Sequence, residues 1–332
     1  MNLLLAQRYR TGELLGTGGA AAVYRAVDQN LGRDVAIKVF NASTSNDDDY
    51  RRQHTETLLL ATLNHPGLVT LHDAGIHEDD SGRTTSFLVM ELVAGRDLRI
   101  LLKAERLDPL EVAQLGADLA DALAYVHSRG VIHRDVKPAN ILLHRTGEHD
   151  TRRYSKLTDF GIARMVDASV ATATGATIGT ANYLSPEQAH GTTVDYKSDI
   201  YSLGLVLLEC LTGEKAFPGP VVEAAVARLL RDPEVPASLG PAWVSLLTSM
   251  TFRSAQLRPD AHEVALTLRE FAGGADDAQP ADSPSQGDAR RTLQELIGHD
   301  SAPTDSSGPI TGGITTGNVY IPAPPAHAPT LG

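Results

Sequence analysis

The sequence predicts an α+β fold in two lobes, a small β-rich N-lobe and a larger α-helical C-lobe, followed by a disordered C-terminal tail. The pattern of residues changes twice along the chain. Up to about Val93, apolar residues occur in short runs between turn residues, which is typical of strands. After Val93 they recur at helical spacing, and from residue 272 onward Pro, Gly, Asp and Thr are frequent. We therefore place the N-lobe at 9–93, the C-lobe at 94–271 and the tail at 272–332.

The N-lobe is predicted from short apolar or alternating runs that turn residues separate. A helix over about 48–63 is expected to interrupt them. The strand-like runs are Tyr9 to Leu15, Val23 to Asp28, Asp34 to Phe40, Leu68 to Ala74 and Phe87 to Leu92.

Two helices of the C-lobe have clear ends or an unusual composition. The first is expected from Asp108 to Gly130, because Asp108 suits an N-cap, Pro109 the first turn and Gly130 the C-terminal end. The second, about 198–211, is apolar on nearly every side and is ended by Gly213. A helix of that kind is buried inside a domain.

The tail has too few apolar residues to form a core. From 271 to 332 the chain holds eight Pro and nine Gly, with seven acidic residues against two basic ones. Burial of its few apolar side chains cannot offset the loss of chain entropy on folding. We expect this segment to be disordered.

Composition excludes several classes of protein. The chain has 332 residues, 42% of them hydrophobic, and a formal charge of −12, which argues against nucleic acid as its main partner. Its lone cysteine, Cys210, rules out a disulfide framework and is typical of a reducing compartment. The sequence has neither a run of ~18 apolar residues nor the features of a signal peptide. We expect a cytoplasmic protein without direct membrane insertion.

A glycine-rich segment joins the first two predicted strands. Gly16, Gly18 and Gly19 lie between Leu15 and Val23, so backbone amides there can approach a polyphosphate without obstruction from Cβ atoms. An ordinary β-turn has a similar sequence, so this segment alone is a weak signal.

A lysine lies within the third strand-like run. Lys38 follows three apolar residues, and a lysine in such a strand either faces solvent or meets anions. Glu56, on the predicted helix that follows, could hold the amine against phosphate oxygens. The alternative is that Glu56 belongs to a solvated helix face.

The strongest local signal lies between residues 131 and 143, and a second carboxylate follows at Asp159. Asp135 could accept a proton from a hydroxyl, and Lys137 could steady a transferring phosphoryl group. Asn140 and Asp159 offer oxygen ligands from separate segments, which suit Mg²⁺ shared with substrate phosphates. A polar surface loop would not explain this order of residues, although Asp159 alone could belong to a simple turn before Gly161.

In this order, the four motifs resemble the signature set of protein kinases. The chain is identified as a member of the bacterial eukaryotic-like (Hanks-type) protein serine/threonine kinases, and the resemblance covers about residues 9–271. It implies the bilobal protein-kinase fold and transfer of the ATP γ-phosphoryl group to Ser or Thr hydroxyls of proteins. ATP and Mg²⁺, with Mn²⁺ as an alternative, are the implied cofactors. Lys137 and Thr180 resemble the Ser/Thr pattern rather than the tyrosine pattern.

The resemblance also implies roles for individual residues. Asp135 would be the catalytic base, Lys137 would assist transfer, Lys38 would contact the α and β phosphates while pairing with Glu56, and Asn140 and Asp159 would bind the metal. Thr180 and Glu187 fall in a peptide-docking segment, Asp199 would hold the backbone of the catalytic loop, and Arg258 would be the buried partner of Glu187. The residues implied to contact ATP are Leu15, Gly16, Gly18, Gly19, Val23, Ala36, Lys38, Met90, Glu91, Val93 and Leu142.

A long loop between Asp159 and Glu187 corresponds to the activation loop of such kinases. Thr172 and Thr174 lie where bacterial relatives carry two threonines separated by one residue. We expect autophosphorylation there, and the added charge of roughly −1.5 to −2 per site would pair with Arg134. The alternative is a flexible polar loop without modification.

Two other functions compete with the kinase interpretation. One is a catalytically silent scaffold that binds ATP, which the presence of Lys38, Asp135 and Asp159 argues against. The other is a small-molecule phosphotransferase of related fold, which would not need the peptide-docking segment. Protein substrates are the expected partners. Phosphothreonine-binding domains on a phosphorylated tail and a homodimer through the N-lobe are further expectations.

Overall fold

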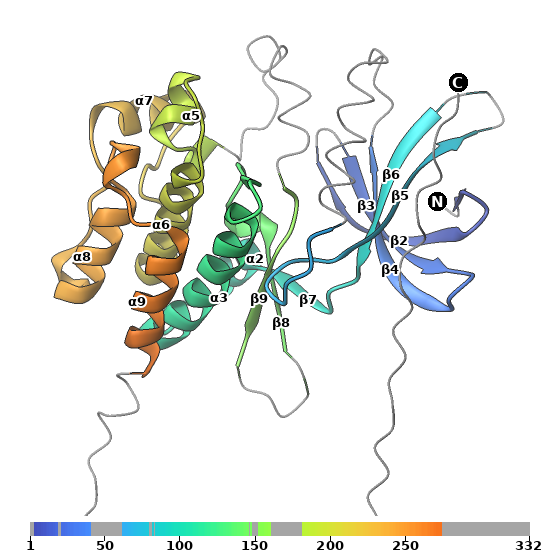
Figure 1. Ribbon diagram of the computed structural model, residues 1–332, viewed down its shortest axis with the longest axis horizontal. Helices are drawn as coiled ribbons and strands as arrows, with labels where there is room; N and C mark the ends of the chain where they lie inside the picture. The colour runs from blue at the N-terminus through green and yellow to red at the C-terminus, as the bar shows by residue number, and fades with distance from the viewer. Residues whose placement is uncertain are drawn as a thin grey trace, which may run out of the picture. The chain divides into compact units, whose positions relative to one another are not determined.

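The computed structural model describes residues 3–18, 21–40, 62–79, 82, 84–145, 147, 152–160 and 181–273. A sheet-rich N-terminal region precedes a helical C-terminal region, which confirms the predicted α+β fold (Figure 1). The helix expected over 48–63 lies outside the described residues except for its last two positions, which are not helical. The tail from 274 to 332 also lies outside them.

The N-lobe is built on one antiparallel sheet of six strands in the order β1-β2-β3-β4-β6-β5. All five predicted strands are present and paired in this sheet. Three begin within two residues of the predicted start, the fourth begins three residues late, at Leu71 instead of Leu68, and the fifth begins three residues early, at Thr84 instead of Phe87. The additional strand β1 has two residues, which is too short to show a periodicity in the sequence. The strands are β1 (Leu4–Leu5), β2 (Tyr9–Thr17), β3 (Ala21–Asp28), β4 (Arg33–Phe40), β5 (Leu71–Glu78) and β6 (Thr84–Glu91).

A small apolar core and a buried ion pair hold this sheet together. Tyr9, Ile37 and Phe87 are buried in the core, and the rings of Tyr9 and Phe87 meet edge to face. Beside it, Arg8 makes two bonds to the buried carboxylate of Asp28, with Nε–Oδ1 at 2.8 Å and Nη2–Oδ2 at 2.7 Å. These hydrogen bonds hold the pKa of Asp28 at about 2, below its ordinary value.

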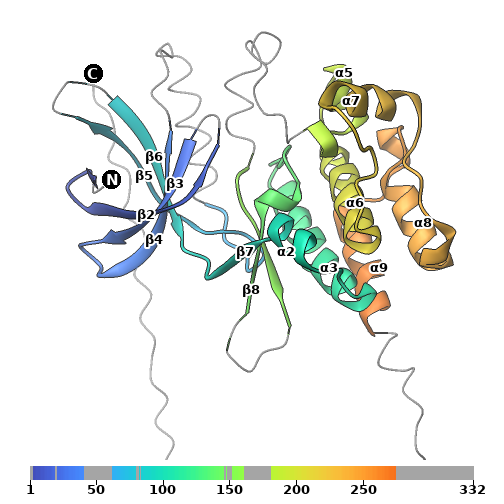
Figure 2. The same ribbon diagram turned by 180° about the vertical axis from the view of Figure 1, so that it is seen from behind.

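The C-lobe combines a three-stranded sheet with a helical core, and Figure 2 shows this from behind. None of the helices in the described ranges is long and apolar enough to cross a membrane. The elements are β7 (Gly95–Asp97), α2 (Leu98–Ala104), α3 (Pro109–His127), η1 (Pro138–Asn140), β8 (Ile141–His144), β9 (Tyr154–Leu157), η2 (Ala181–Tyr183), α5 (Pro186–His190), α6 (Lys197–Thr212), α7 (Val221–Leu230), η3 (Ala237–Leu239), α8 (Pro241–Met250), η4 (Ala255–Leu257) and α9 (Ala261–Gly273).

Helices α3 and α6 form the centre of this lobe. The start of α3 and the end of α6 lie where the sequence predicts them, but α3 ends at His127, three residues before the predicted Gly130. The side chain of Asp108 caps α3 by accepting from the amide of Leu110, and α6 ends at Gly213 in a left-handed conformation. Helix α6 is buried along almost its whole length, as its composition predicts. A Cβ atom at Gly116 would lie 2.9 Å from Leu268 of α9, so the glycine permits close packing of α3 against α9.

The two lobes meet along the edge of β9. Leu68 forms a bridge with Leu157, and the amide of Val69 donates to the carbonyl of Leu157 at 2.9 Å. This pairing explains why β5 begins only at Leu71, because the residues before it pair with the C-lobe. Strand β9 leads directly to Asp159, so the contact between the lobes lies next to a predicted site residue.

We expect Gly95→Ala to destabilise the fold. A Cβ atom at Gly95 would lie 1.8 Å from the carbonyl oxygen of Leu143, so β7 and β8 would have to separate. The free energy of unfolding should fall by about 2 kcal/mol in urea denaturation. Gly147→Ala is the control, because no described atom lies within 4 Å of the added methyl group. Equal stability of the two variants would contradict the prediction.

Candidate active site

The predicted residue Lys38 reaches across from the N-lobe to a predicted residue of the C-lobe. Its Nζ atom lies 2.7 Å from Oδ1 of Asp159, and both side chains are partly buried. The expected partner of Lys38, Glu56, lies outside the described residues. Lys38 projects from β4, whereas Asp159 follows β9, so this ion pair joins the two lobes.

Asp159 lies at a strained point of the backbone. Its φ angle is +58°, in the left-handed region that residues other than glycine seldom adopt. The preceding residue, Thr158, is held on both sides: its amide donates to the carbonyl of Asn140 at 2.9 Å, and its carbonyl lies 3.0 Å from Nε2 of His133. These bonds place Asp159 beside Asn140, the other predicted metal ligand.

The carboxylate of Asp135 is held by two other predicted residues. Lys137 Nζ donates to its Oδ2 atom at 2.6 Å, and Asn140 Nδ2 donates to the same atom at 3.0 Å. Asn140 Nδ2 also donates to the carbonyl of Asp135 at 2.9 Å. Since the amide nitrogen of Asn140 faces Asp135, its amide oxygen points the other way and is available as a metal ligand.

His133 supports the 131–137 loop as a neutral residue. The side chain is fully buried, and burial lowers its pKa below the ordinary value, against the opposing influence of Asp199 and Asp135. Its Nδ1 atom accepts from the amide of Asp135 at 3.3 Å, so Nε2 carries the proton donated to Thr158. The ring thereby links the 131–137 loop to the segment that carries Asp159.

Asp199, in the first turn of the buried helix α6, holds the backbone of the same loop. Its carboxylate accepts from the amides of His133 and Arg134, each at 2.8 Å. The third bond is to His127, whose Nε2 atom lies 2.8 Å from Oδ2. Sequence reasoning singled out Asp199 but missed His127, because nothing in the sequence relates the end of α3 to α6.

Glu187 and Arg258 form a buried pair behind the predicted docking segment. The guanidinium donates from Nη1 to Oε1 at 2.8 Å and from Nη2 to Oε2 at 3.0 Å. Burial alone would raise the pKa of Glu187, but hydrogen bonds from Arg258 and Ser198 hold it below its ordinary value. Arg258 also donates to the carbonyls of Phe252, Lys197 and Arg253, so this pair fastens η4 to α5 and α6.

The predicted ATP-contacting residues of the N-lobe lie on one face of the sheet. Val23 is paired with Lys38 across β3 and β4, and Ala36 with Met90 across β4 and β6. Directly paired residues in antiparallel strands point to the same face. Val23, Ala36 and Met90 therefore share the face from which Lys38 reaches Asp159.

The remaining predicted ATP-contacting residues in the described ranges come from the ends of β2 and β6 and from β8. The turn after Gly16 is closed by a bond from the amide of Gly18 to the carbonyl of Ala21 at 2.8 Å. Leu142 of β8 is paired with Asp97 of β7. Leu15 is half exposed at the end of β2, and Glu91 and Val93, both partly buried, lie where β6 continues into the C-lobe.

Glu91 is tied to both lobes at this crossing. Its Oε2 atom accepts from Lys156 Nζ at 2.9 Å, and the same ammonium donates to the carbonyl of Leu68 at 3.3 Å. The amide of Glu91 donates to the carbonyl of Thr70 at 2.9 Å. Sequence reasoning missed Lys156, since a lysine in a short strand has no distinctive pattern.

Five predicted site residues lie outside the described residues: Gly19, Glu56, Thr172, Thr174 and Thr180.

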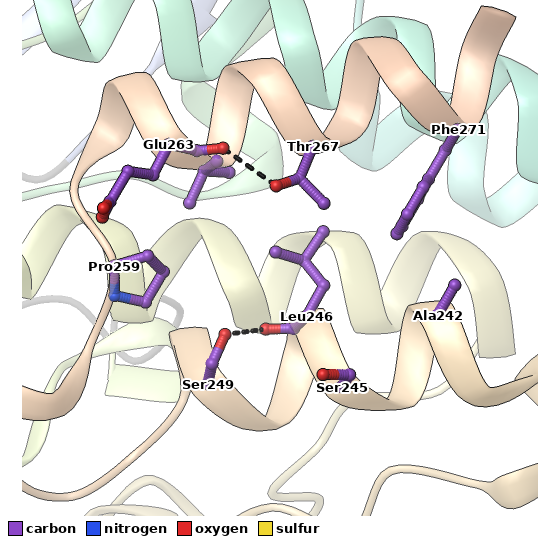
Figure 3. A pocket seen from close by; sticks show the side chains of 9 residues that line it. Ala242, Ser245, Leu246, Ser249, Pro259, Glu263, Thr267 and Phe271 are labelled. Atoms are coloured by element: carbon purple, nitrogen blue, oxygen red, sulfur yellow. Dashed lines mark hydrogen bonds between the residues drawn. The ribbon is translucent and has the colours of Figure 1, made fainter.

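A hollow of about 340 Å³ lies between α8 and α9 and contains none of the predicted residues (Figure 3). Two of its three hydroxyl groups bond within their own helices, because Ser249 donates to the carbonyl of Leu246 and Thr267 to that of Glu263. The Glu263 carboxylate accepts from the amide of Asp260. We assign no binding role to this hollow.

Comparison with known proteins identifies the family. The model of the protein kinase domain matches residues 9–267. The chain is 38% identical to the serine/threonine-protein kinase PknB of Mycobacterium tuberculosis over 308 residues, which are 90% of this chain and 48% of that protein. It is 40% identical to PknB of Mycolicibacterium smegmatis over 87% of this chain and 46% of the relative. For the kinase PknA of M. tuberculosis the identity is 40%, over 71% of this chain and 54% of the relative. The chain thus spans about half the length of the curated relatives it matches.

Removal of Arg258 should test the buried pair. Arg258→Ala leaves the Glu187 carboxylate without its cation in a buried place, so we expect the free energy of unfolding to fall by about 3–5 kcal/mol. Arg269→Ala breaks an exposed pair with Asp121 and should cost about 0.5 kcal/mol. Urea denaturation of both variants measures the difference, and similar losses would contradict the buried character of the Glu187 pair.

Proposed function

This chain belongs to the protein kinase family, and on that premise we propose that it is a protein serine/threonine kinase. It transfers the γ-phosphoryl group of ATP to Ser or Thr hydroxyls of protein substrates. One observation carries the proposal: Lys38, the 135–140 segment and Asp159 come from three separate parts of the chain and are brought together. Lys38 pairs with Asp159, Lys137 and Asn140 bond Asp135, and the amide of Thr158 joins the two groups by its bond to the carbonyl of Asn140.

We assign Asp135 as the base that accepts the proton of the attacking hydroxyl. Lys137 and Asn140 both bond its Oδ2 atom, which restricts the carboxylate to one orientation. A base held in this way acts mainly through position, because a hydroxyl bound next to it needs little further ordering to react. Lys137 also supplies positive charge close to the place where the phosphoryl group is transferred.

The donor groups around Asp159 suit a nucleotide with a divalent metal. Asn140 and Asp159 offer hard oxygen atoms, which Mg²⁺ prefers and Mn²⁺ accepts. The metal would neutralise charge on the phosphates that it shares with these residues. The apolar face of Val23, Ala36 and Met90 would take the adenine ring.

Lys38 and the turn at Gly16 and Gly18 would hold the phosphates. We assign Glu56 as the carboxylate that positions the Lys38 ammonium for this contact. The remaining proposed ATP contacts are Leu15, Gly19, Glu91, Val93 and Leu142.

We assign the docking of the substrate peptide to the segment that ends at Glu187, with Thr180 as the residue that selects Ser and Thr. Buried Glu187 and Arg258 fix the end of this segment to α6 and η4. The kinase would work in the cytoplasm, where ATP is available and where Cys210 stays reduced. Phosphothreonine-binding domains and a second copy of the N-lobe are its proposed partners besides substrates.

Two substitutions in the site test the activity. Asp135→Asn keeps the size of the side chain but removes the base, so kcat for peptide phosphorylation should fall about 10²–10⁴-fold while ATP still binds. Lys38→Met should also abolish measurable transfer, because it removes the cation that holds the phosphates. Asp232→Asn, the same chemical change at an exposed position, is the control. A protein that binds ATP but has the same negligible rate with and without Asp135 would be a scaffold and not an enzyme.

Autophosphorylation provides an independent test. Incubation of the purified protein with Mg²⁺ and ATP, followed by phosphosite mapping, should place phosphate on Thr172 and Thr174. Lys38→Met should remain unmodified under the same conditions. If active protein carries phosphate at neither threonine, the assignment of these two sites is wrong.

A further inference from the structure

Gln188 lies directly behind the 131–137 loop and was not among the residues that the sequence singled out. It is the third residue after Ser185, the N-cap of α5. Its side-chain oxygen accepts from the amide of Ser185 at 2.9 Å, and the hydroxyl of Ser185 accepts from the amide of Gln188 at 3.3 Å. These two bonds form a capping box, whose S-x-x-Q pattern is visible in the sequence.

The amide nitrogen of the same side chain makes a hydrogen bond outside α5. Nε2 of Gln188 donates to the main-chain carbonyl of Arg134 at 2.8 Å. Arg134 has a φ angle of +66°, in the left-handed region that disfavours residues with a Cβ atom. A backbone conformation of this kind persists only where its surroundings hold it, and Gln188 supplies one of the bonds that do so.

The carbonyl of Arg134 and the amide of Asp135 belong to the same peptide plane. Gln188 holds the carbonyl end of this plane, and His133 Nδ1 accepts from the amide end at 3.3 Å. The amide of Arg134, one plane earlier, donates to Asp199 at 2.8 Å. Because a peptide unit is planar and stiff, these bonds fix the direction in which the Asp135 side chain leaves the backbone.

We propose that Gln188 is a positioning residue for Asp135, and that it acts through the carbonyl of Arg134. The proposal rests on the proposed kinase function and deepens it. It also gives a physical link between the docking segment, which ends beside Gln188, and the loop that carries the base.

The capping role and the positioning role can be separated by one substitution. A capping box accepts Glu as well as Gln at this position, since both offer an oxygen to the N-cap amide. Only Gln also offers an N–H group to the carbonyl of Arg134. Gln188→Glu therefore retains the cap but places a carboxylate oxygen against a carbonyl oxygen.

For Gln188→Glu we expect kcat for a peptide substrate to fall about 10–100-fold, as displacement of a reacting group by about 1 Å does. The KM for ATP and the midpoint of urea unfolding should remain at the wild-type values. Gln256→Glu is the matched control, because Gln256 is exposed on η4 and its side chain, among the described residues, bonds only Ser254. Gln188→Met, which removes both groups without adding charge, should lower kcat similarly and also lower the unfolding midpoint. If Gln188→Glu does lower the unfolding midpoint, kcat of Gln188→Met decides the question. It is measured under conditions in which that variant is fully folded, and a wild-type kcat there would overturn the proposal.

A double mutant shows whether the effect passes through the base. In the Asp135→Asn background, Gln188→Glu should leave the residual rate unchanged, because there is no carboxylate left to orient. Wild-type kcat in Gln188→Glu, or an equal loss in both backgrounds, would overturn the proposal. Failure of the proposed kinase function would give a different result: Asp135→Asn alone would then leave the rate unaltered.

Discussion

The geometry of the site depends on one buried carboxylate, that of Asp199. It lies at the start of a helix buried along almost its whole length, where an ionised group is costly unless every side of it is hydrogen-bonded. Two backbone amides of the 131–137 loop and the ring of His127 provide those bonds. The hydrogen bonds that the Asp199 carboxylate requires therefore hold the loop against the core of the C-lobe. The position of Asp135 is then determined, because it is part of that loop.

The rest of the site is attached to this anchor by short steps. His133 connects the loop to Thr158, and the carbonyl of Asn140 connects to the same residue, so the backbone at Asp159 is held by bonds to its neighbour, while its side chain pairs with Lys38. The left-handed conformations of Arg134 and Asp159 lie at the two ends of this connection. Strain of this kind at adjacent points indicates that the backbone is shaped for the position of the side chains and not for its own stability.

Much of the fold follows from local patterns. The start of α3 and the end of α6 were predicted from Asp108, Pro109 and Gly213, because caps and turns are short-range features, whereas α3 ends three residues before the predicted Gly130. The start of β5 was predicted wrongly, since the pairing of Leu68 with Leu157 joins residues far apart in the sequence. For the same reason β1 was missed: its two residues are fixed by pairing with β2 and not by a pattern of their own.

Several predicted site residues in the described ranges are joined by hydrogen bonds and ion pairs, but the residues that support them were largely invisible in the sequence. Motif spacing indicates which groups meet a substrate, whereas His127, Lys156 and Gln188 act by reaching across the tertiary structure. Only Gln188 had a signal in the sequence, its capping box, and that signal predicts a helix start and not a bond to Arg134.

The ion pair of Lys156 with Glu91 determines how the lobes can move. Lys156 also donates to the carbonyl of Leu68, next to the bridge between Leu68 and Leu157. The contacts between the lobes therefore lie along one line. These bonds resist separation of the lobes along this line, and rotation about the line is the movement that disturbs them least. Asp159 follows Leu157 by two residues and so lies close to the line. A rotation of this kind would therefore displace Asp159 little, and the N-lobe strands farther from the line would move more.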